Sequence, residues 1–367
     1  MTLRDLSADR KNNLNIIRLF ASLMVLYMHS FSVCISDSSG DITYFLTNHK
    51  QLSGGLAVDI FFIISGFLIT RSYDRSKNLW SYIKARFLRI WPLLFVVVMV
   101  TAFIIGPIIS SCTLAEYFQP EVLKFLRNAL FINTYSYLPG VFNYHYNHSL
   151  NGSLWTLQYE VICYILVVLT AFIWRKVKAA APAVVVILAG LYYYSTYVAA
   201  FSFGPLSANF VSNFVRLAMF FAMGMTYYCY EDKIKLEFKG FCLAFAGLVV
   251  GILFFDFEYF FALFGSYMIF YIAFQKHFVA SWYDRVGDLS YGIYIMAFPI
   301  QQIWLDMVGH PTEHYNTMTM NPYLNMVLTI LIVLPLSWFT WHYIEEPCLR
   351  LKNTRLFKVS TGHQKKS

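Results

Sequence analysis

Two ionisable side chains, Arg18 and His29, stand in the apolar stretch IIRLFASLMVLYMHSF at residues 16–31. A neutral imidazole can act near pH 7 as a general base or as a nucleophile. The two residues are eleven positions apart, which is about 16 Å of helical rise and a return to almost the same helix face. A charge at the centre of a bilayer costs about 2.5 to 3.5 kcal/mol or more, so a functional role is expected for this pair.

Two carboxylates occupy similar apolar surroundings. Asp59 lies in GGLAVDIFFIISGFLIT and Glu160 lies in NGSLWTLQYEVICY. If the segments run through a membrane, His29 and both carboxylates lie roughly 10 to 12 Å below its outer surface. A packed histidine and two carboxylates that merely pair with neighbours would be the structural alternative. Three such groups at one depth, with Arg18 below them, favour a catalytic site.

A second cluster of charges lies in RSYDRSKNLWSYIKARFLRIWPL, where Arg86 and Arg89 are three residues apart and share a helix face. Two guanidinium groups at this spacing could bind a phosphate or a pyrophosphate through paired hydrogen bonds. They could instead anchor the chain to anionic lipid at the inner membrane surface. Charge alone favours the lipid anchor.

The composition indicates which elements must position these groups. Of 367 residues, 58% are hydrophobic and 13% are charged, with Lys and Arg exceeding Asp and Glu by eight. Repeated apolar runs approaching about 20 residues predict an all-α, polytopic transmembrane helical bundle. The six cysteines are scattered without a C-x-x-C pair, so no zinc or redox motif is predicted, and no metal site is proposed.

Ten spans are predicted, with both termini in the cytoplasm. Their approximate cores are residues 14–36, 52–70, 88–109, 152–174, 180–198, 209–230, 240–255, 257–274, 287–306 and 324–343. The longest connection, residues 113–151, contains EVLKFLRNALFI, whose helical periodicity predicts an interfacial or re-entrant helix. We predict one membrane-embedded domain over residues 1–367, with its core at about 10–350 and a short basic cytoplasmic tail at 351–367.

The distribution of basic residues supports this topology, because short cytoplasmic loops carry the excess of Lys and Arg. With the N-terminus inside, 23 of the 28 basic residues fall on the inner side and only Lys50, Lys124 and Arg127 fall outside. Arg18 and Arg216 remain within spans. The positive net charge is therefore explained by membrane topology, and no nucleic-acid partner is expected.

Six motifs, in this order, resemble the acyltransferase-3 family of bacterial integral membrane acyltransferases. They are the Arg18-to-His29 spacing, GGLAVDIFFIISGFLI, RFLRIWP, SLWTLQYE, LSYGIYIMAFPI and YIEEP, and they cover about residues 10–350. The resemblance implies an O-acyltransferase, most simply an O-acetyltransferase, in the bacterial inner membrane. The donor would be cytoplasmic acyl-CoA, namely acetyl-CoA, used as a substrate. The acceptor would be a periplasmic or lipid-linked glycan such as O-antigen or exopolysaccharide.

Residue roles also follow from the resemblance. It implies that His29 is the catalytic histidine, that Arg18 is its motif partner and that Glu160 is the active-site acid. It assigns Arg86 and Arg89 to the phosphates of coenzyme A. From the residues alone, either Asp59 or Glu160 could orient the imidazole, and His29 could be a base or a transient acyl carrier.

The sequence departs from the family at Met296 and Ala297, where many relatives have a Trp-His pair before Phe-Pro. This substitution bears on acceptor specificity, which no motif specifies. A multi-span transporter or lipid flippase is the alternative function, given the charges within the spans and Arg216 in the sixth. Against it, the sequence shows no inverted repeat and no paired helices broken by Gly or Pro. Acyl chain length and oligomeric state are not specified either.

Overall fold

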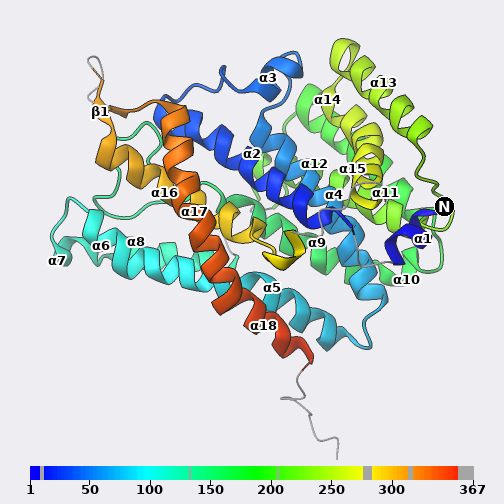
Figure 1. Ribbon diagram of the computed structural model, residues 1–367, viewed down its shortest axis with the longest axis horizontal. Helices are drawn as coiled ribbons and strands as arrows, with labels where there is room; N and C mark the ends of the chain where they lie inside the picture. The colour runs from blue at the N-terminus through cyan, green and yellow to red at the C-terminus, as the bar shows by residue number, and fades with distance from the viewer. Residues whose placement is uncertain (9–11, 132–133, 205, 276–282, 313–316, 354–367) are drawn as a thin grey trace, which may run out of the picture.

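The computed structural model describes residues 1–8, 12–131, 134–204, 206–275, 283–312 and 317–353, and these are mostly helical (Figure 1). Residues 354–367 of the predicted basic tail lie outside the described part. Within that part, seven helices are long and apolar enough to cross a membrane. They are Leu14–Cys34, Ser53–Asp74, Leu79–Ile109, Ala180–Val198, Ala208–Cys229, Phe257–Phe274 and Pro322–Arg350.

The other three predicted spans are also helical, but they differ from these seven. Leu154–Leu169 and Phe238–Phe254 are apolar and shorter. The helix α16, Ser290–Val308, contains Gln301, Gln302 and Asp306 and is not among the seven. Every predicted span thus coincides with a helix, while the count of ten crossings stays a prediction.

The centre of the bundle consists of α2 (Leu14–Cys34), α4 (Ser53–Asp74), α12 (Ala208–Cys229) and α16. α4 packs against α12 and α2, while α16 packs against α2 and α17 (Pro322–Thr340). Gly66 of α4 and Gly224 of α12 allow a very close crossing: a Cβ at either glycine would stand 1.9 Å from a backbone oxygen of the other helix. The close α4–α12 crossing therefore leaves no room for a side chain at either position.

α5 (Leu79–Val100) forms the lower side of the molecule in Figure 1 and continues through a π-helical turn, Thr101–Ile105, into α6 (Gly106–Ile109). The Asn78 side chain caps its first turn by accepting from the backbone N–H of Ser81 at 2.8 Å. The connection that follows contains α7 (Leu114–Tyr117), α8 (Pro120–Leu126) and the 3₁₀ turn Arg127–Leu130, which pack back along α5. A helix was predicted here, and its existence is confirmed.

The remaining elements complete the bundle. They are α1 (Leu3–Ala8), α3 (Ile42–Leu46), the 3₁₀ turn Leu154–Thr156, α9 (Leu157–Leu169), α10 (Ala171–Trp174), α11 (Ala180–Tyr193) with its π turn Tyr194–Val198, α13 (Phe238–Phe254), α14 (Phe257–Phe260), the π turn Phe261–Gly265, α15 (Ser266–Phe274) and the 3₁₀ turn Tyr283–Arg285. After α17 come the π turn Trp341–Glu345, α18 (Glu346–Arg350) and the 3₁₀ turn Leu351–Asn353. The described strands are β1 (His310–Pro311) and β2 (Met318–Thr319), which form an antiparallel pair.

Candidate active site

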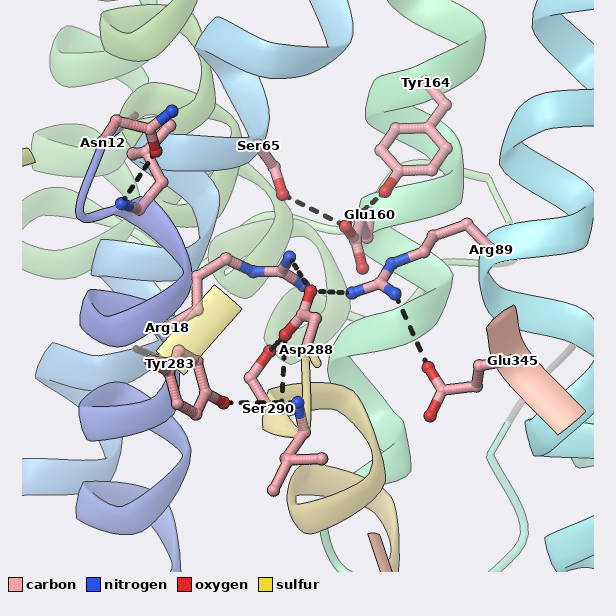
Figure 2. A network of polar contacts seen from close by, with 12 residues as sticks. Asn12, Arg18, Ser65, Arg89, Glu160, Tyr164, Tyr283, Asp288, Ser290 and Glu345 are labelled. Carbon is pink, nitrogen blue, oxygen red and sulfur yellow. Dashed lines mark hydrogen bonds and ion pairs between the residues drawn. The ribbon is translucent and has the colours of Figure 1, made fainter. Parts of the chain in front are cut away.

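The polar centre of the bundle is Asp288, a buried carboxylate in the connection that leads into α16. Figure 2 shows the guanidinium groups of Arg18 from α2 and Arg89 from α5 converging on it. Arg18 Nη1 donates to Asp288 Oδ2 at 2.6 Å, and Arg89 Nη2 donates to the same oxygen. The other oxygen accepts from the hydroxyl of Ser290 at 2.5 Å and from its backbone N–H at 3.3 Å. One carboxylate thus joins three helices.

Arg89 has a second acidic neighbour. Its Nη1 lies 3.5 Å from Oε2 of Glu345, and its guanidinium carbon lies 5.6 Å from the centre of the Trp341 ring. Trp341 and Glu345 are the first and last residues of the π turn after α17, a geometry that changes the direction of side chains along a helix. Arg89 is therefore held by two carboxylates and an aromatic face.

Arg86, one turn earlier on α5, has a different environment. Its Nε is buried and has no hydrogen-bond partner among the described residues. The side chain lines a small cavity of about 70 Å³ together with Arg18, Arg89 and Glu160. Of the two arginines in RFLRIWP, Arg86 is thus the one with donor capacity left for a ligand.

Glu160 lies in the first turn of α9, facing α4 (Figure 2). Its Oε1 accepts from the hydroxyl of Ser65 at 3.2 Å and from the hydroxyl of Tyr164. Two donors on one oxygen fix the orientation of the carboxylate. This fixed carboxylate faces the same cavities as Arg18 and Arg86.

Three cavities follow one face of α4. The chamber next to Glu160, about 50 Å³, is lined by Arg18, Phe61 and Tyr294 among others. It shares Arg18, Ser65, Glu160 and Tyr291 with the Arg86 cavity. The Arg86 cavity in turn shares Leu68 with a much larger cavity of about 880 Å³ at the far end of α4. Cavities that share lining residues are adjacent, so they form a line along the helix.

His29 is buried on α2, beyond the chamber. Its ring meets the ring of Phe298 edge-on at 4.9 Å between centroids, and its Nδ1 has no hydrogen-bond partner among the described residues. Phe298 lies one turn along α16 from Tyr294, which lines the chamber. The imidazole therefore retains an unused nitrogen and packs against a residue one helical turn beyond the chamber lining.

Asp59 has other partners. Arg216 Nη1 of α12 donates to both of its oxygens, at 2.7 and 2.9 Å, and Gln51 Nε2 donates to Oδ2 at 3.2 Å. The carboxylate is fully buried and the arginine nearly so. Asp59 thus neutralises the intramembrane charge of Arg216, which the sequence left without a partner.

The connection that contains residues 145–151 is hydrogen-bonded to α16. Asn151 Nδ2 donates to the backbone oxygen of Ile295 at 2.8 Å, and His145 Nδ1 is 2.8 Å from Oε1 of Gln302. Burial lowers the pKa of His145 below its ordinary value, although Gln302 and Asp306 act in the opposite direction. The hydrogen bonds fasten residues 145–151 to α16 above His29.

The predicted site residues therefore fall into three groups. Arg18, Arg86, Arg89 and Glu160 line adjacent cavities, His29 packs against Phe298 outside their lining, and Asp59 is paired with Arg216. No hydrogen bond or ion pair joins His29, Asp59 and Glu160 to one another within the described residues.

Sequence reasoning gave no role to Asp288 or Glu345. Asp288 directly precedes the motif LSYGIYIMAFPI, and Glu345 is the first acid of YIEEP. Both acids lie at the edge of an apolar segment, and the sequence left Arg18 and Arg89 without acidic partners. This combination could have identified Asp288 and Glu345.

Comparison with known proteins gives three findings. A family model described as an acyltransferase domain matches residues 11–342. A protein named O-acetyl transferase, from Shigella phage Sf6, is 29% identical over 373 residues, which is 95% of this chain and 98% of that protein. Nodulation protein 10 of Rhizobium leguminosarum bv. viciae is 32% identical over 188 residues, half of each chain. No solved structure matches.

Proposed function

Because the chain belongs to the acyltransferase-3 family, we propose that this membrane protein transfers an acetyl group from cytoplasmic acetyl-CoA to a hydroxyl of a periplasmic or lipid-linked glycan. The name of the Shigella phage relative supports O-acetyl transfer as the reaction class. The acceptor, such as an O-antigen or an exopolysaccharide, and the placement in a bacterial inner membrane are parts of the proposal.

The observation that carries the proposal is the arrangement of Arg18 and His29 on one helix. Arg18 lines the chamber, while His29 keeps an unbonded, buried Nδ1 beyond it, against Phe298. A buried polar atom without a partner is costly, so an unused imidazole nitrogen is expected to meet a substrate. This is where a donor that enters along the cavities would bring its thioester.

Imidazole chemistry suits this reaction in two ways. As a base, His29 takes the proton of the acceptor hydroxyl while that oxygen attacks the thioester carbonyl and the thiolate of coenzyme A departs. As a carrier, it takes the acyl group itself and then passes it to the hydroxyl. Glu160 is proposed as the active-site acid whose charge stabilises the charged imidazole. Either route balances, because the leaving thiolate accepts the proton released by the hydroxyl.

A transfer assay tests the proposal directly. Purified protein in lipid nanodiscs is given acetyl-CoA labelled in the acetyl group, with and without glycans extracted from the host surface. The proposal expects free coenzyme A and labelled glycan, or slow hydrolysis when acceptor is absent, and neither product with the His29→Ala protein. A folded protein that binds acetyl-CoA but releases no coenzyme A would instead favour the transporter or flippase alternative.

A further inference from the structure

The largest of the three cavities, about 880 Å³, has a distinctive lining. We call it the vestibule; it is lined by Ser7, Ala8, Asn12, Leu14, Leu68, Arg71, Ser72, Arg75, Ser76, Lys77, Ser81, Phe274 and Lys352. Four of these side chains are cations, and no carboxylate lines the vestibule in the part of the chain that the structure describes. Serine hydroxyls and the apolar Leu14, Leu68 and Phe274 complete the wall. The vestibule thus combines positive charge, hydroxyl groups and an apolar surface.

The charge of the vestibule is only partly balanced by its neighbours. The Arg71 side chain donates one hydrogen bond to the backbone oxygen of Ser7 at 2.7 Å and has Glu231 as an acidic neighbour, whereas the side chains of Arg75 and Lys77 are exposed and make no hydrogen bond or ion pair with the described residues. In the inner cavities more of the positive charge is paired, because Arg18 and Arg89 form ion pairs with Asp288, and Arg89 also with Glu345. A polyanion therefore gains more from the vestibule than from the inner cavities.

The vestibule and the Arg86 cavity lie side by side along α4. Leu68 lines both of them, and Ser65, which donates to Glu160, lies one turn farther along, about 5 Å at the rise of an α-helix. A ligand with an anionic head in the vestibule could extend a thin arm past Arg86 towards Arg18 and Glu160. This is the shape of acyl-CoA.

We propose that the vestibule binds the 3′-phosphoadenosine end of acyl-CoA, with its 3′-phosphate held by Arg75 and Lys77. The diphosphate then reaches Arg86, and the acylated arm occupies the inner cavities. Coenzyme A carries phosphate at these two separate places, so two cationic sites at different depths match it better than one. This inference rests on the proposed function and deepens it by giving the nucleotide a site distinct from the Arg86–Arg89 pair.

A binding experiment tests the nucleotide site without requiring turnover. Adenosine 3′,5′-bisphosphate and AMP are titrated calorimetrically into protein in nanodiscs of neutral lipid. Adenosine 3′,5′-bisphosphate should bind about tenfold or more tightly than AMP, and the Arg75→Ala/Lys77→Ala protein should lose that preference. Lys239→Ala is the matched control, because it removes an exposed cation outside the vestibule and should change nothing.

A kinetic experiment then separates the two phosphate sites. Acetyl-CoA is compared with acetyl-dephospho-CoA, which lacks only the 3′-phosphate. The wild-type protein should have a KM about tenfold higher for the dephospho donor, and the Arg75→Ala/Lys77→Ala protein should have equal, raised KM values for both. Arg86→Ala should raise both KM values by the same factor, because it acts on the diphosphate that the two donors share.

The outcomes distinguish this inference from the proposed function. If acetyl transfer proceeds but the double variant keeps the wild-type preference for acetyl-CoA, the vestibule assignment is wrong and the proposed function stands. If the bisphosphate binds as described but no donor is consumed, the nucleotide site stands and the proposed function fails. If the bisphosphate does not bind, and the double variant loses only association with vesicles containing phosphatidylglycerol, the cations are lipid anchors and the inference is overturned.

Discussion

Arg86 and Arg89 lie one turn apart on α5 but have unlike partners. Arg86→Ala should weaken acetyl-CoA binding by about 1.5 to 3 kcal/mol, the range for a charge-assisted hydrogen bond, without loss of folded protein. Lysine should restore affinity only in part, because it lacks the planar, paired donors of arginine. Calorimetric titration of each variant provides the measurement. Unchanged affinity in Arg86→Ala would return this residue to the role of a lipid anchor.

Arg89→Ala is expected to act on stability first. The change leaves Asp288 with one arginine and Glu345 without its ion-pair partner, and breaking a buried ion pair on one side costs about 3 to 5 kcal/mol. Thermal unfolding in detergent, followed by size-exclusion chromatography, should show a clearly lower Tm than for Arg86→Ala. Equal Tm values for the two variants would contradict the structural difference between them.

His29 provides the most direct test of catalysis. His29→Ala removes the unbonded imidazole at a site with few polar contacts, so the protein should fold, insert and bind acetyl-CoA with near wild-type affinity. Transfer should be abolished, because both the base and the carrier route need the ring. Labelled-acetyl transfer and calorimetric binding are measured on the same preparation. Near-normal glycan acetylation would exclude His29 from the mechanism.

Replacing Glu160 and Asp59 by their amides should have different effects, on activity in the first case and on stability in the second. Glu160→Gln keeps the shape at the chamber but cannot stabilise a charged imidazole, so a normal Tm with most activity lost is expected. Asp59→Asn leaves Arg216 buried without its counter-charge and should lower Tm or expression first. Both variants are assayed for Tm and acetyl transfer. A folded but inactive Asp59→Asn protein beside an active Glu160→Gln protein would reverse the two roles.

Depth along a helix could be predicted from the sequence for individual residues, whereas their contacts could not. Helical rise alone predicts a common depth for His29, Asp59 and Glu160. It does not predict which neighbouring helix each side chain faces. Asp59 meets Arg216 because α4 and α12 cross closely, and that crossing depends on Gly66 and Gly224, which are far apart in the chain. The pairing of Asp288 with Arg18 and Arg89 likewise joins segments about 200 to 270 residues apart.

At the scale of the elements, the α4–α12 crossing holds the cavity wall in place. A methyl group at Gly66 would stand 1.9 Å from the backbone oxygen of Phe221, and a backbone cannot rotate away as a side chain can. Gly66→Ala should therefore force the helices apart and destabilise the protein by about 1 to 3 kcal/mol, the usual cost of overpacking. Gly190→Ala in α11 is the control, because no atom lies within 4 Å of the added Cβ.

Thermal unfolding of these two variants gives the measurement. Gly190→Ala should leave Tm unchanged or slightly raised, since alanine favours a helix over glycine. Gly66→Ala should lower Tm and, because α4 lines all three cavities, should also weaken acetyl-CoA binding. Similar Tm values for the two proteins would mean that the close crossing contributes little.

The helices themselves could be predicted well because apolar length is a local property of the sequence. Two elements were harder to assign as membrane spans. The helix α16 contains two glutamines and an aspartate, and α9 is short. Gln301 donates to α2 and Gln302 donates to residues 147–149, and both side chains are fully buried, so their polarity has structural partners that no hydropathy pattern reveals.

At the scale of the whole molecule, the proposed reaction requires two faces with different tasks. The vestibule must open to the cytoplasm, where acyl-CoA is made, while the segments fastened above His29 must meet the acceptor outside. The basic residues predict this orientation, because the loop with Arg71, Arg75 and Lys77 belongs to the inner set and the loop after α2 to the outer set. Orientation is thus a functional prediction as well as a topological one.

Cysteine labelling can test that orientation. Ser39→Cys places a thiol in the exposed connection after α2, and Lys77→Cys places one in the vestibule. In spheroplasts treated with a membrane-impermeant maleimide, Ser39→Cys should be labelled at once, whereas Lys77→Cys should be labelled only after the membrane is opened. The parent protein, with its six native cysteines, gives the background. The opposite pattern would put the vestibule outside, where no acyl-CoA reaches it, and would contradict the topology and the donor site together.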